Sequence, residues 1–263
     1  MPQFSANLGF LWGRLPLCER IERAARAGFA AVELHWPYDT PAEAVRESCG
    51  TNGVALLGIN TPFGDADAGE FGLAALPGRE DDFARSFEMT VAYARAAGAR
   101  HIHVLAGVVP ADRREAARPV LVANLRRAAE IAPDLMLVVE PLNARDRPDY
   151  FYARAGEAIA VIEEVGAPNL RLMFDAYHVG MMGEDVGATL ASALPHVGHV
   201  QIAAVPSRAE PDEGKVDYRA FFADLDRLGY AGWVGCEYVP RGDTDEGLSW
   251  MRTLLSVPAQ QIE

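Results

Sequence analysis

Short apolar runs alternate along the chain with amphipathic segments about twice as long. The apolar runs cover residues 4–10, 30–36, 54–60, 100–107, 135–140, 170–175, 197–203 and 232–238. In "LMLVV", residues 135–139, five apolar residues follow one another without alternation. Such runs are typical of strands that are buried on both faces between layers of helix, as in parallel sheets. The pattern therefore predicts eight parallel strands.

The segments between these runs carry apolar residues at helical spacing. Phe83, Phe87, Val91 and Ala94 recur every three or four residues, which predicts a helix with one buried face. The same spacing is found at Ile159, Ile162 and Val165, and again at Tyr218, Phe222, Leu225 and Leu228. Glycines lie where these helices should end, as the left-handed C-cap favours: Gly28, Gly53, Gly98, Gly166 and Gly229.

Eight strand-then-helix units in 263 residues predict a (β/α)8 TIM barrel that forms one domain over residues 1–263. The alternative is an open, doubly wound sheet. Such a sheet usually has a glycine-rich phosphate-binding loop after its first strand, and "NLGFLWGRL" lacks the required glycine spacing. The barrel is therefore favoured.

Polar side chains stand at the ends of most of the expected strands. Glu140 follows the apolar run of the fifth strand directly, where an unpaired carboxylate would be costly. In a barrel the carboxyl ends of all strands meet at one face, which is where enzymes of this fold hold their chemistry. The residues expected at that face are Glu33, His35, Asn60, His103, Glu140, Asp175, Gln201 and Glu237.

The three carboxylates of Glu140, Asp175 and Glu237 raise an electrostatic problem. At about 5 Å and an effective dielectric near 20, each pair repels by roughly 3 kcal/mol. Either two of them are protonated, or a divalent cation lies among them with the Gln201 amide oxygen as a fourth ligand. Oxygen ligands favour Mg²⁺ or Mn²⁺ over zinc.

The histidines near this face are weaker candidates. His178, in "FDAYH", has three open roles: metal ligand, partner of a carboxylate, or loop cap. His199 lies one layer deeper than Gln201, which favours a barrel-interior histidine over a ligand. His101 and His103 point to the same side of their strand, and His103 is the better site candidate of the two.

Composition narrows the class of protein. The net charge of −13 argues against nucleic acid and anionic membranes as partners. No run of about 18 apolar residues and no signal-peptide pattern is present, so we expect a cytoplasmic protein. Cys18, Cys49 and Cys236 share no metal or redox spacing, which fits a reducing compartment. Lys215 is the only lysine and lies in an acidic loop, so a Schiff-base aldolase is nearly excluded.

Several segments resemble the hydroxypyruvate isomerase family, which belongs with the xylose isomerase-like barrels. They are "FSANLGFLW", "AGFAAVELHWPYD", "GLAALPGRE", "HVLAGVVPA", "VVEPLN", "FDAYH", "GHVQIA" and "GWVGCEYVPRGDTDEGLSWM". The resemblance spans nearly the whole chain. It implies a divalent metal held by Glu140, Asp175, Gln201 and Glu237, and it implies that Glu140 and Glu237 exchange protons with the substrate.

The resemblance implies a small hydroxy keto acid as the substrate. Conversion of hydroxypyruvate to tartronate semialdehyde is the first expectation. The alternative is the 2-oxo-tetronate isomerase branch, to which "INTPFGDADAGEFGLAALPGRE" and "HVQIAAVPSRAEPDEGKVDY" are more similar. Hydroxypyruvate isomerases more often carry a histidine near the third strand end, where this chain has Ile59 and Asn60.

Basic side chains are required to hold the carboxylate of such a substrate. Arg208 and Arg241 follow strand ends and are the candidates, with Lys215 third. The other substrate-binding candidates are His178, Asn60 and His103. The loop of residues 61–80 has no clear periodicity, and we expect it to close over the substrate.

Three other classes stay open or are disfavoured. A metal-dependent aldolase would use the same chemistry but cleave a carbon–carbon bond, and a noncatalytic sugar-acid binding protein would hold the ligand without turnover. A barrel nuclease would require several zinc-binding histidines and a basic groove, which six scattered histidines and a charge of −13 do not offer. The sequence leaves open whether the chain forms a homo-oligomer.

Overall fold

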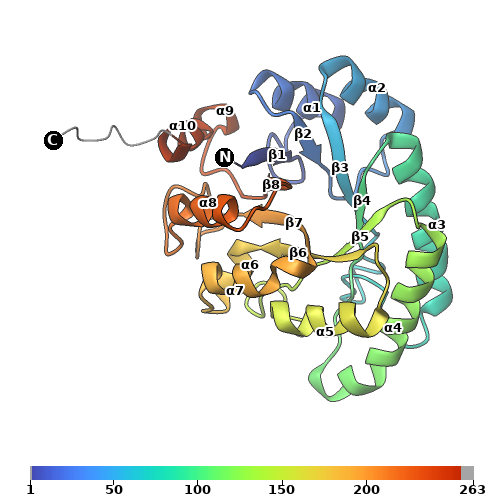
Figure 1. Cartoon of the computed structure of the whole chain (residues 1–263). Helices are drawn as coiled ribbons and strands as arrows, with labels where there is room; N and C mark the ends of the chain where they lie inside the picture. The colour runs from blue at the N-terminus through green and yellow to red at the C-terminus, as the bar shows by residue number, and fades with distance from the viewer. Residues whose placement is uncertain (1, 256–263) are drawn as a thin grey trace.

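The computed structural model describes residues 2–255, and eight parallel strands close into a barrel in sequence order, with β8 beside β1 (Figure 1). The strands are β1 (Gln3–Asn7), β2 (Ala31–Glu33), β3 (Ala55–Asn60), β4 (His101–His103), β5 (Met136–Val139), β6 (Leu170–Asp175), β7 (Val197–Ile202) and β8 (Trp233–Cys236). The predicted (β/α)8 TIM barrel is thereby confirmed. The expected domain limits, residues 1 and 263, lie outside the described residues.

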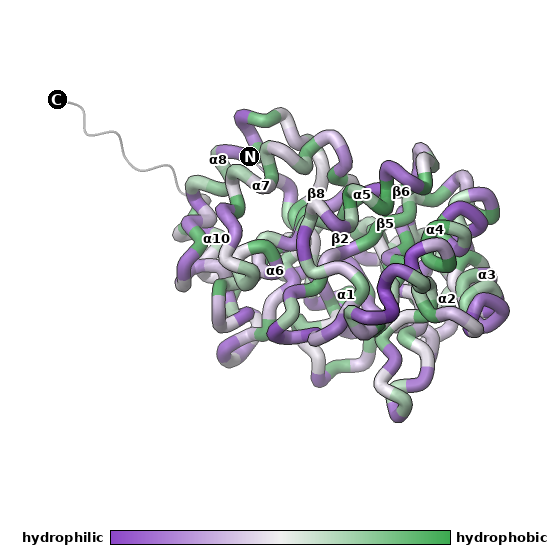
Figure 2. Tube along the Cα trace, turned by 90° about the horizontal axis from the view of Figure 1, so that it is seen from below, coloured by the Kyte–Doolittle hydropathy of each residue, from purple (hydrophilic) through white to green (hydrophobic). Residues whose placement is uncertain are grey.

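Helices surround the barrel and follow their strands along the chain (Figure 1). They are α1 (Leu17–Arg26), α2 (Ala42–Asn52), α3 (Glu80–Ala97), α4 (Arg114–Ile131), α5 (Ala155–Val165), α6 (Ala176–Met181), α7 (Val186–Ala193), α8 (Tyr218–Arg227), α9 (Thr244–Gly247) and α10 (Ser249–Leu255), with 3-10 turns η1 (Ala111–Arg113) and η2 (Leu194–His196). Figure 2 shows hydrophilic residues, in purple, spread along outer segments such as α3 and α4. No helix among the described residues is long and apolar enough to cross a membrane.

The helix ends agree with the glycine pattern. Gly53, Gly98 and Gly166 occupy the left-handed C-caps of α2, α3 and α5. Gly28 and Gly229 also have positive φ, but each lies one residue beyond the cap of its helix. The glycines therefore mark the chain reversals that send each of these helices into the next strand.

Most strands are shorter than their apolar runs, and the fourth shows why. The run at 100–107 is a strand only over His101–His103. Its later residues bond instead to the loop between β3 and α3: the Ala75 N–H donates to the Ala106 carbonyl oxygen at 2.7 Å, and Gly72 forms a bridge with Ala106. The chain leaves the sheet here because that loop, rather than a neighbouring strand, forms hydrogen bonds with its backbone.

The barrel interior is unusually polar. Barrel cores are commonly filled by branched apolar side chains, yet here Glu33, His101 and His199 are buried inside. Glycines make the room: a Cβ on Gly58 would lie 1.9 Å from His101 Nε2, and one on Gly235 would lie 2.4 Å from Glu33 Oε1. The fold therefore supports a layer of buried polar groups beneath the carboxyl ends of the strands.

Candidate active site at the barrel mouth

A cavity of about 540 Å³ opens at the carboxyl ends of the strands. Asn60, His103, Glu140 and Glu237 line it from four different strand ends. His178 and Arg208 complete the polar wall, from the first turn of α6 and from the loop after β7. Most of the residues that the sequence placed at this face thus surround one cavity.

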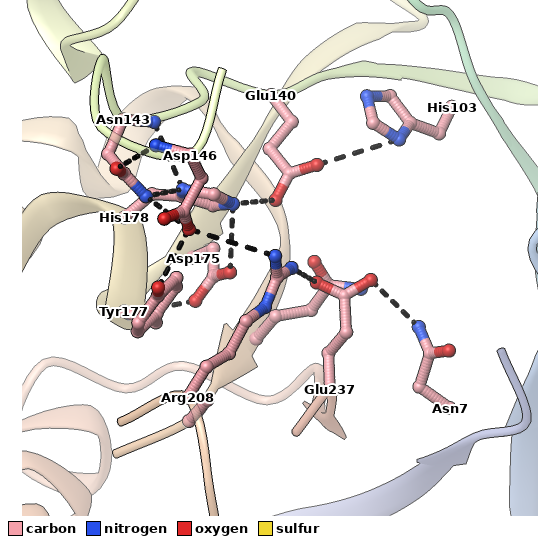
Figure 3. Close-up of polar contacts among 12 residues, drawn as sticks. Asn7, His103, Glu140, Asn143, Asp146, Asp175, Tyr177, His178, Arg208 and Glu237 are labelled. Carbon is pink, nitrogen blue, oxygen red and sulfur yellow. Dashed lines mark hydrogen bonds and ion pairs between the residues drawn. The ribbon is translucent and has the colours of Figure 1, made fainter. Parts of the chain in front are cut away.

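The carboxylates of Glu140 and Asp175 lie against His178 (Figure 3). One ligand atom from each of the three residues lies within 4.8 Å of the others, and all three residues are buried. Asp175 is also the N-cap of α6, where its Oδ1 accepts the Tyr177 N–H at 2.8 Å. This cap fixes the carboxylate, and its second oxygen, Oδ2, lies 3.6 Å from His178 Nε2.

Three oxygens in this region have no hydrogen-bond partner among the described residues. They are Glu140 Oε1, Asp175 Oδ2 and Gln201 Oε1. Buried acceptors are rarely left unpaired, because each one costs the free energy of its lost hydration. Carboxylate and amide oxygens are the ligands that hard divalent cations prefer. The donor set therefore fits a metal ion, and it includes three of the four expected ligands.

Mutual repulsion changes the ionisation of these acids. Burial raises the pKa of Glu140 well above its usual range, and the charges of Glu237 and Asp175 raise it further. Burial and the charge of Glu237 raise the pKa of Asp175 to about 7. Without a cation, burial and mutual repulsion therefore disfavour the charged forms of Glu140 and Asp175. A bound cation would favour these charged forms.

Glu237 has a different environment from the other two acids. Its Oε1 accepts from Asn7 Nδ2 at 3.1 Å and its Oε2 accepts from Arg208 at 3.2 Å (Figure 3). His35 Nε2 also lies 2.9 Å from Oε1. Burial opposes the charged form, but the hydrogen bond to His35 and the charge of Arg208 outweigh it and lower the pKa of Glu237 to about 2. Glu237 is therefore ionised at neutral pH.

The hydrogen bonds of His178 decide its tautomer. Its Nδ1 accepts the backbone N–H of Asn143 at 3.0 Å, and the Asn143 side-chain nitrogen lies 2.7 Å from the same atom. Burial and the charge of Arg208 lower the pKa of His178 to about 3, so the ring is neutral. The proton is then on Nε2, which lies 3.8 Å from Glu140 Oε1 and 3.6 Å from Asp175 Oδ2. This tautomer favours an N–H donor over a metal ligand.

The two candidate arginines differ in position. Arg208 lines the cavity, and its guanidinium carbon lies 5.0 Å from the ring centroid of Phe10 and 5.0 Å from that of Tyr177. Its backbone is in the left-handed region, with φ of 57°, a conformation that costs a non-glycine residue energy and is found most often at functional sites. Its Nε is buried without a partner among the described residues.

Arg241, by contrast, is not among the residues that line the cavity. Its guanidinium pairs with Glu210 at 2.9 Å, Asp212 at 2.6 Å and Glu213 at 3.0 Å. These acids satisfy its charge and hold it in the loop after β8, which corrects the expectation that it faces the substrate. Lys215 does not line the cavity either.

A second polar layer lies beneath the cavity. Gln201 donates its Nε2 to Glu33 Oε2 at 2.8 Å. Ser5 Oγ donates to the other oxygen, Oε1, from which His199 Nε2 lies 3.1 Å away. Burial opposes ionisation of Glu33, but its interactions with His199 and Ser5 are stronger and lower its pKa.

The loop between β3 and α3 covers one side of the cavity. Phe63, Glu70 and Phe71 line the cavity from this loop, and Arg147 lies over the Phe71 ring at 3.8 Å. Glu70 forms an ion pair with Arg79 within the loop. The loop is thus placed to cover a ligand, and its closure stays a prediction.

Sequence reasoning missed part of the polar wall. Asn7 ends β1, and its place at a strand end was the available signal. His35, which the sequence did place at this face, follows β2, but nothing in the sequence indicated that it contacts Glu237. Asp146, which accepts from Tyr177 Oη at 2.7 Å, lies in an irregular loop that gave no signal.

Comparisons with known proteins agree with this geometry. The family model of the xylose isomerase-like TIM barrel matches residues 21–254. The chain is 42% identical over 258 residues to a 2-oxo-tetronate isomerase of Cupriavidus necator, covering 97% of this chain and 99% of the relative. It is 38% identical over 254 residues to a hydroxypyruvate isomerase of Escherichia coli, covering 95% and 98%.

Among solved structures, the chain is similar to one described as an AP endonuclease, family 2, from Brucella melitensis. The TM-score is 0.93 at 39% identity, and the match covers 96% of this chain and 99% of that chain. A 3-keto-D-glucoside 4-epimerase from Escherichia coli superposes with a TM-score of 0.80 at 20% identity, covering 96% and 99%. The second likeness shows the shared fold alone.

The raised acid pKa values predict how stability depends on pH. In metal-free protein, we expect the free energy of unfolding to fall as pH rises from about 4, where an unfolded aspartate ionises, to about 7, the pKa of Asp175. The native state binds more protons than the unfolded state in this window, so rising pH favours unfolding. Added Mg²⁺ should raise the thermal midpoint more at pH 8 than at pH 5.

Thermal unfolding in EDTA and in Mg²⁺ across this pH range measures the effect. Asp175→Asn is the matched control, because asparagine can keep the N-cap of α6 but does not ionise. It should reduce the pH dependence and leave the part that comes from Glu140, whose pKa is also raised. An equal Mg²⁺ effect at both pH values, or a wild-type slope in Asp175→Asn, contradicts the assignment.

Proposed function

The chain belongs to the family of hydroxypyruvate isomerases and 2-oxo-tetronate isomerases within the xylose isomerase-like TIM barrels, and from this premise we propose that it is a metal-dependent isomerase of a small hydroxy keto acid. The observation that carries the proposal is the set of buried oxygens of Glu140, Asp175 and Gln201 that have no partner among the described residues, next to a cavity that Glu140 and Glu237 line. The reaction moves a carbonyl between adjacent carbons.

Glu140, Asp175, Gln201 and Glu237 would hold the cation, and their oxygen atoms favour Mg²⁺ or Mn²⁺. A divalent ion in this position supplies stabilisation of the negative charge that develops on the substrate oxygens. His178, with its proton on Nε2, acts as a hydrogen-bond donor to the substrate or to these acids rather than as a fifth ligand.

The two glutamates handle the protons. Isomerisation removes a proton from the carbon beside the carbonyl, passes through an enediolate and returns a proton to the neighbouring carbon. Two acids whose environments push their pKa values apart suit this pair of tasks. Without a cation the pKa of Glu237 is lowered and the pKa of Glu140 is raised, and a bound cation would favour the charged form of both.

Arg208 binds the carboxylate of the substrate. It presents a planar set of donors at the cavity, and a guanidinium pairs with a carboxylate through two parallel hydrogen bonds. The guanidinium carbon of Arg208 lies 5.0 Å from the ring centroids of Phe10 and Tyr177. Asn60 and His103, which line the same cavity, are the neutral candidates for the hydroxyl groups of the substrate.

Hydroxypyruvate, converted to tartronate semialdehyde, is the substrate we favour, and a 2-oxo-tetronate is the second candidate. The full-length identities do not separate the two, because they are 42% to a 2-oxo-tetronate isomerase, 38% to a hydroxypyruvate isomerase and 44% to a putative hydroxypyruvate isomerase of Mus musculus. Endonuclease activity, by which the Brucella protein is described, is disfavoured for this chain by the net charge of −13.

A substrate panel tests the function directly. Hydroxypyruvate and 2-oxo-tetronate should be isomerised, with activity lost to a chelator and restored by Mg²⁺ or Mn²⁺. Product analysis by NMR separates isomerisation from carbon–carbon cleavage, which would indicate an aldolase, and from binding without turnover. Undiminished turnover after verified metal removal would contradict the metal site.

Substitution of the glutamates tests their role. Glu140→Gln and Glu237→Gln should each lower kcat by about 10²- to 10⁴-fold, as expected for the loss of a general acid or base. Asp175→Asn removes an expected ligand but no proton carrier, so excess metal should restore its activity more fully. Glu130→Gln, at an exposed position in α4, is the matched control. Rates of both site variants within about threefold of wild type are incompatible with this mechanism.

Arg208→Ala tests recognition of the carboxylate. Loss of a charged hydrogen-bonded pair costs about 1.5–3 kcal/mol, so kcat/KM should fall by about 10- to 150-fold, with much of the loss in KM. Arg241→Ala is the control, because Arg241 lies outside the cavity. Similar kinetic losses in the two variants would remove Arg208 from its proposed role.

A further inference from the structure

Glu33 lies at the end of β2, inside the barrel beneath the cavity, and only 3% of its surface is exposed. It is not among the residues that line the cavity. Both of its carboxylate oxygens are engaged: Oε1 by Ser5 and Oε2 by the Gln201 amide nitrogen at 2.8 Å. Glu33 therefore contacts an expected metal ligand from the side opposite to the substrate.

An amide ligand has an orientation problem that a carboxylate ligand does not have. The side chain of Gln201 ends in one oxygen and one NH₂ group of nearly equal size, and only the oxygen can bind a cation. A free amide can rotate by 180° and present the NH₂ group to the metal. A neighbour that distinguishes the two ends must therefore fix the amide.

An ionised carboxylate is such a neighbour, because it accepts hydrogen bonds but donates none. The Gln201 amide must therefore direct its NH₂ group to the Glu33 carboxylate. Its Oε1 is then left buried without a partner among the described residues. We propose that Glu33 is a positioning residue that locks the Gln201 amide with its oxygen directed to the metal. This inference rests on the proposed metal site.

The barrel is built around this pair. The register of β2 against β3 shifts between Val32 and Glu33, and such irregularities commonly redirect a side chain. Gly235 on β8 leaves the space: a Cβ there would lie 2.4 Å from Glu33 Oε1 and 2.9 Å from Gln201 Cγ. Ser5 and His199 contact Oε1 and hold the carboxylate in place.

Exchanging the hydrogen-bond donor and acceptor between positions 33 and 201 distinguishes an orienting role of Glu33 from a packing role. In Glu33→Gln, the new amide can face Gln201 with either end, so the lock is lost. In Gln201→Glu, two carboxylates face each other. When both substitutions are combined, the new amide at position 33 can donate to the new carboxylate at position 201, which offers its second oxygen to the metal.

Mn²⁺ affinity of the four proteins, measured by calorimetry, tests the proposal, with circular dichroism as the check on folding. Groups that orient a ligand are typically worth 10- to 100-fold in metal affinity. We expect Glu33→Gln to weaken Mn²⁺ binding by about that factor in the wild-type background, and to strengthen it in the Gln201→Glu background. A loss of packing would lower affinity in both backgrounds.

The outcomes are distinct. Wild-type protein that binds no Mn²⁺ contradicts the proposed metal site, and with it the function. If wild type binds but Glu33→Gln stays within about threefold, or weakens binding equally in both backgrounds, only the orienting role is overturned. Because Glu33 is buried, the variants risk misfolding, and a measurement on wild type avoids this.

That measurement is the side-chain amide signal of Gln201 in ¹⁵N NMR spectra, assigned by its absence in Gln201→Leu. The NH₂ protons should be protected from exchange with solvent in metal-free protein, because they are bonded to Glu33. Mg²⁺ should shift the ¹³C signal of the amide carbonyl and leave the protection unchanged. Rapid exchange of the NH₂ protons in either state would contradict the lock.

Discussion

The repulsion among Glu140, Asp175 and Glu237 at one barrel mouth is the constraint on which the rest of the site depends. All three carboxylates are buried, and neighbouring like charges oppose one another's ionisation. A closed parallel barrel brings them together regardless of this cost, because the carboxyl ends of its strands meet at one face. The groups around these carboxylates therefore determine which of the three are ionised.

The groups around Glu237 and Glu140 shift the pKa values of these two acids in opposite directions. Glu237 receives donors from β1, from the segment after β2 and from the loop after β7, and its pKa is lowered. Among the described residues, the polar contacts of Glu140 are distant ones to His103 at 3.6 Å and His178 at 3.8 Å, and its pKa is raised. In the metal-free protein this asymmetry gives two chemically equivalent side chains different proton affinities.

The buried polar layer beneath the mouth follows from the same constraint. The oxygens of Glu140, Asp175 and Gln201 that lack partners within residues 2–255 need fixed side chains, and a fixed amide at Gln201 needs a partner that accepts hydrogen bonds. Glu33 is this partner, and it lies inside the barrel, where apolar side chains are common. Gly58 and Gly235, on β3 and β8, are small because His101 and Glu33 occupy the space that their side chains would fill.

The sequence by itself determined the barrel, because eight buried strands and their helices leave a periodic pattern that depends only on neighbouring residues. It also placed Glu140, Asp175, Gln201 and Glu237 at strand ends, since strand topology brings such ends together. Only the tertiary structure decided the partners. The contact of His35 with Glu237, the tautomer of His178, the departure of Arg241 from the cavity and the amide orientation of Gln201 all depend on side chains far apart in the sequence. Periodicity records which face a residue occupies, whereas hydrogen bonds depend on directions and distances across the barrel, and these exist only once it has closed.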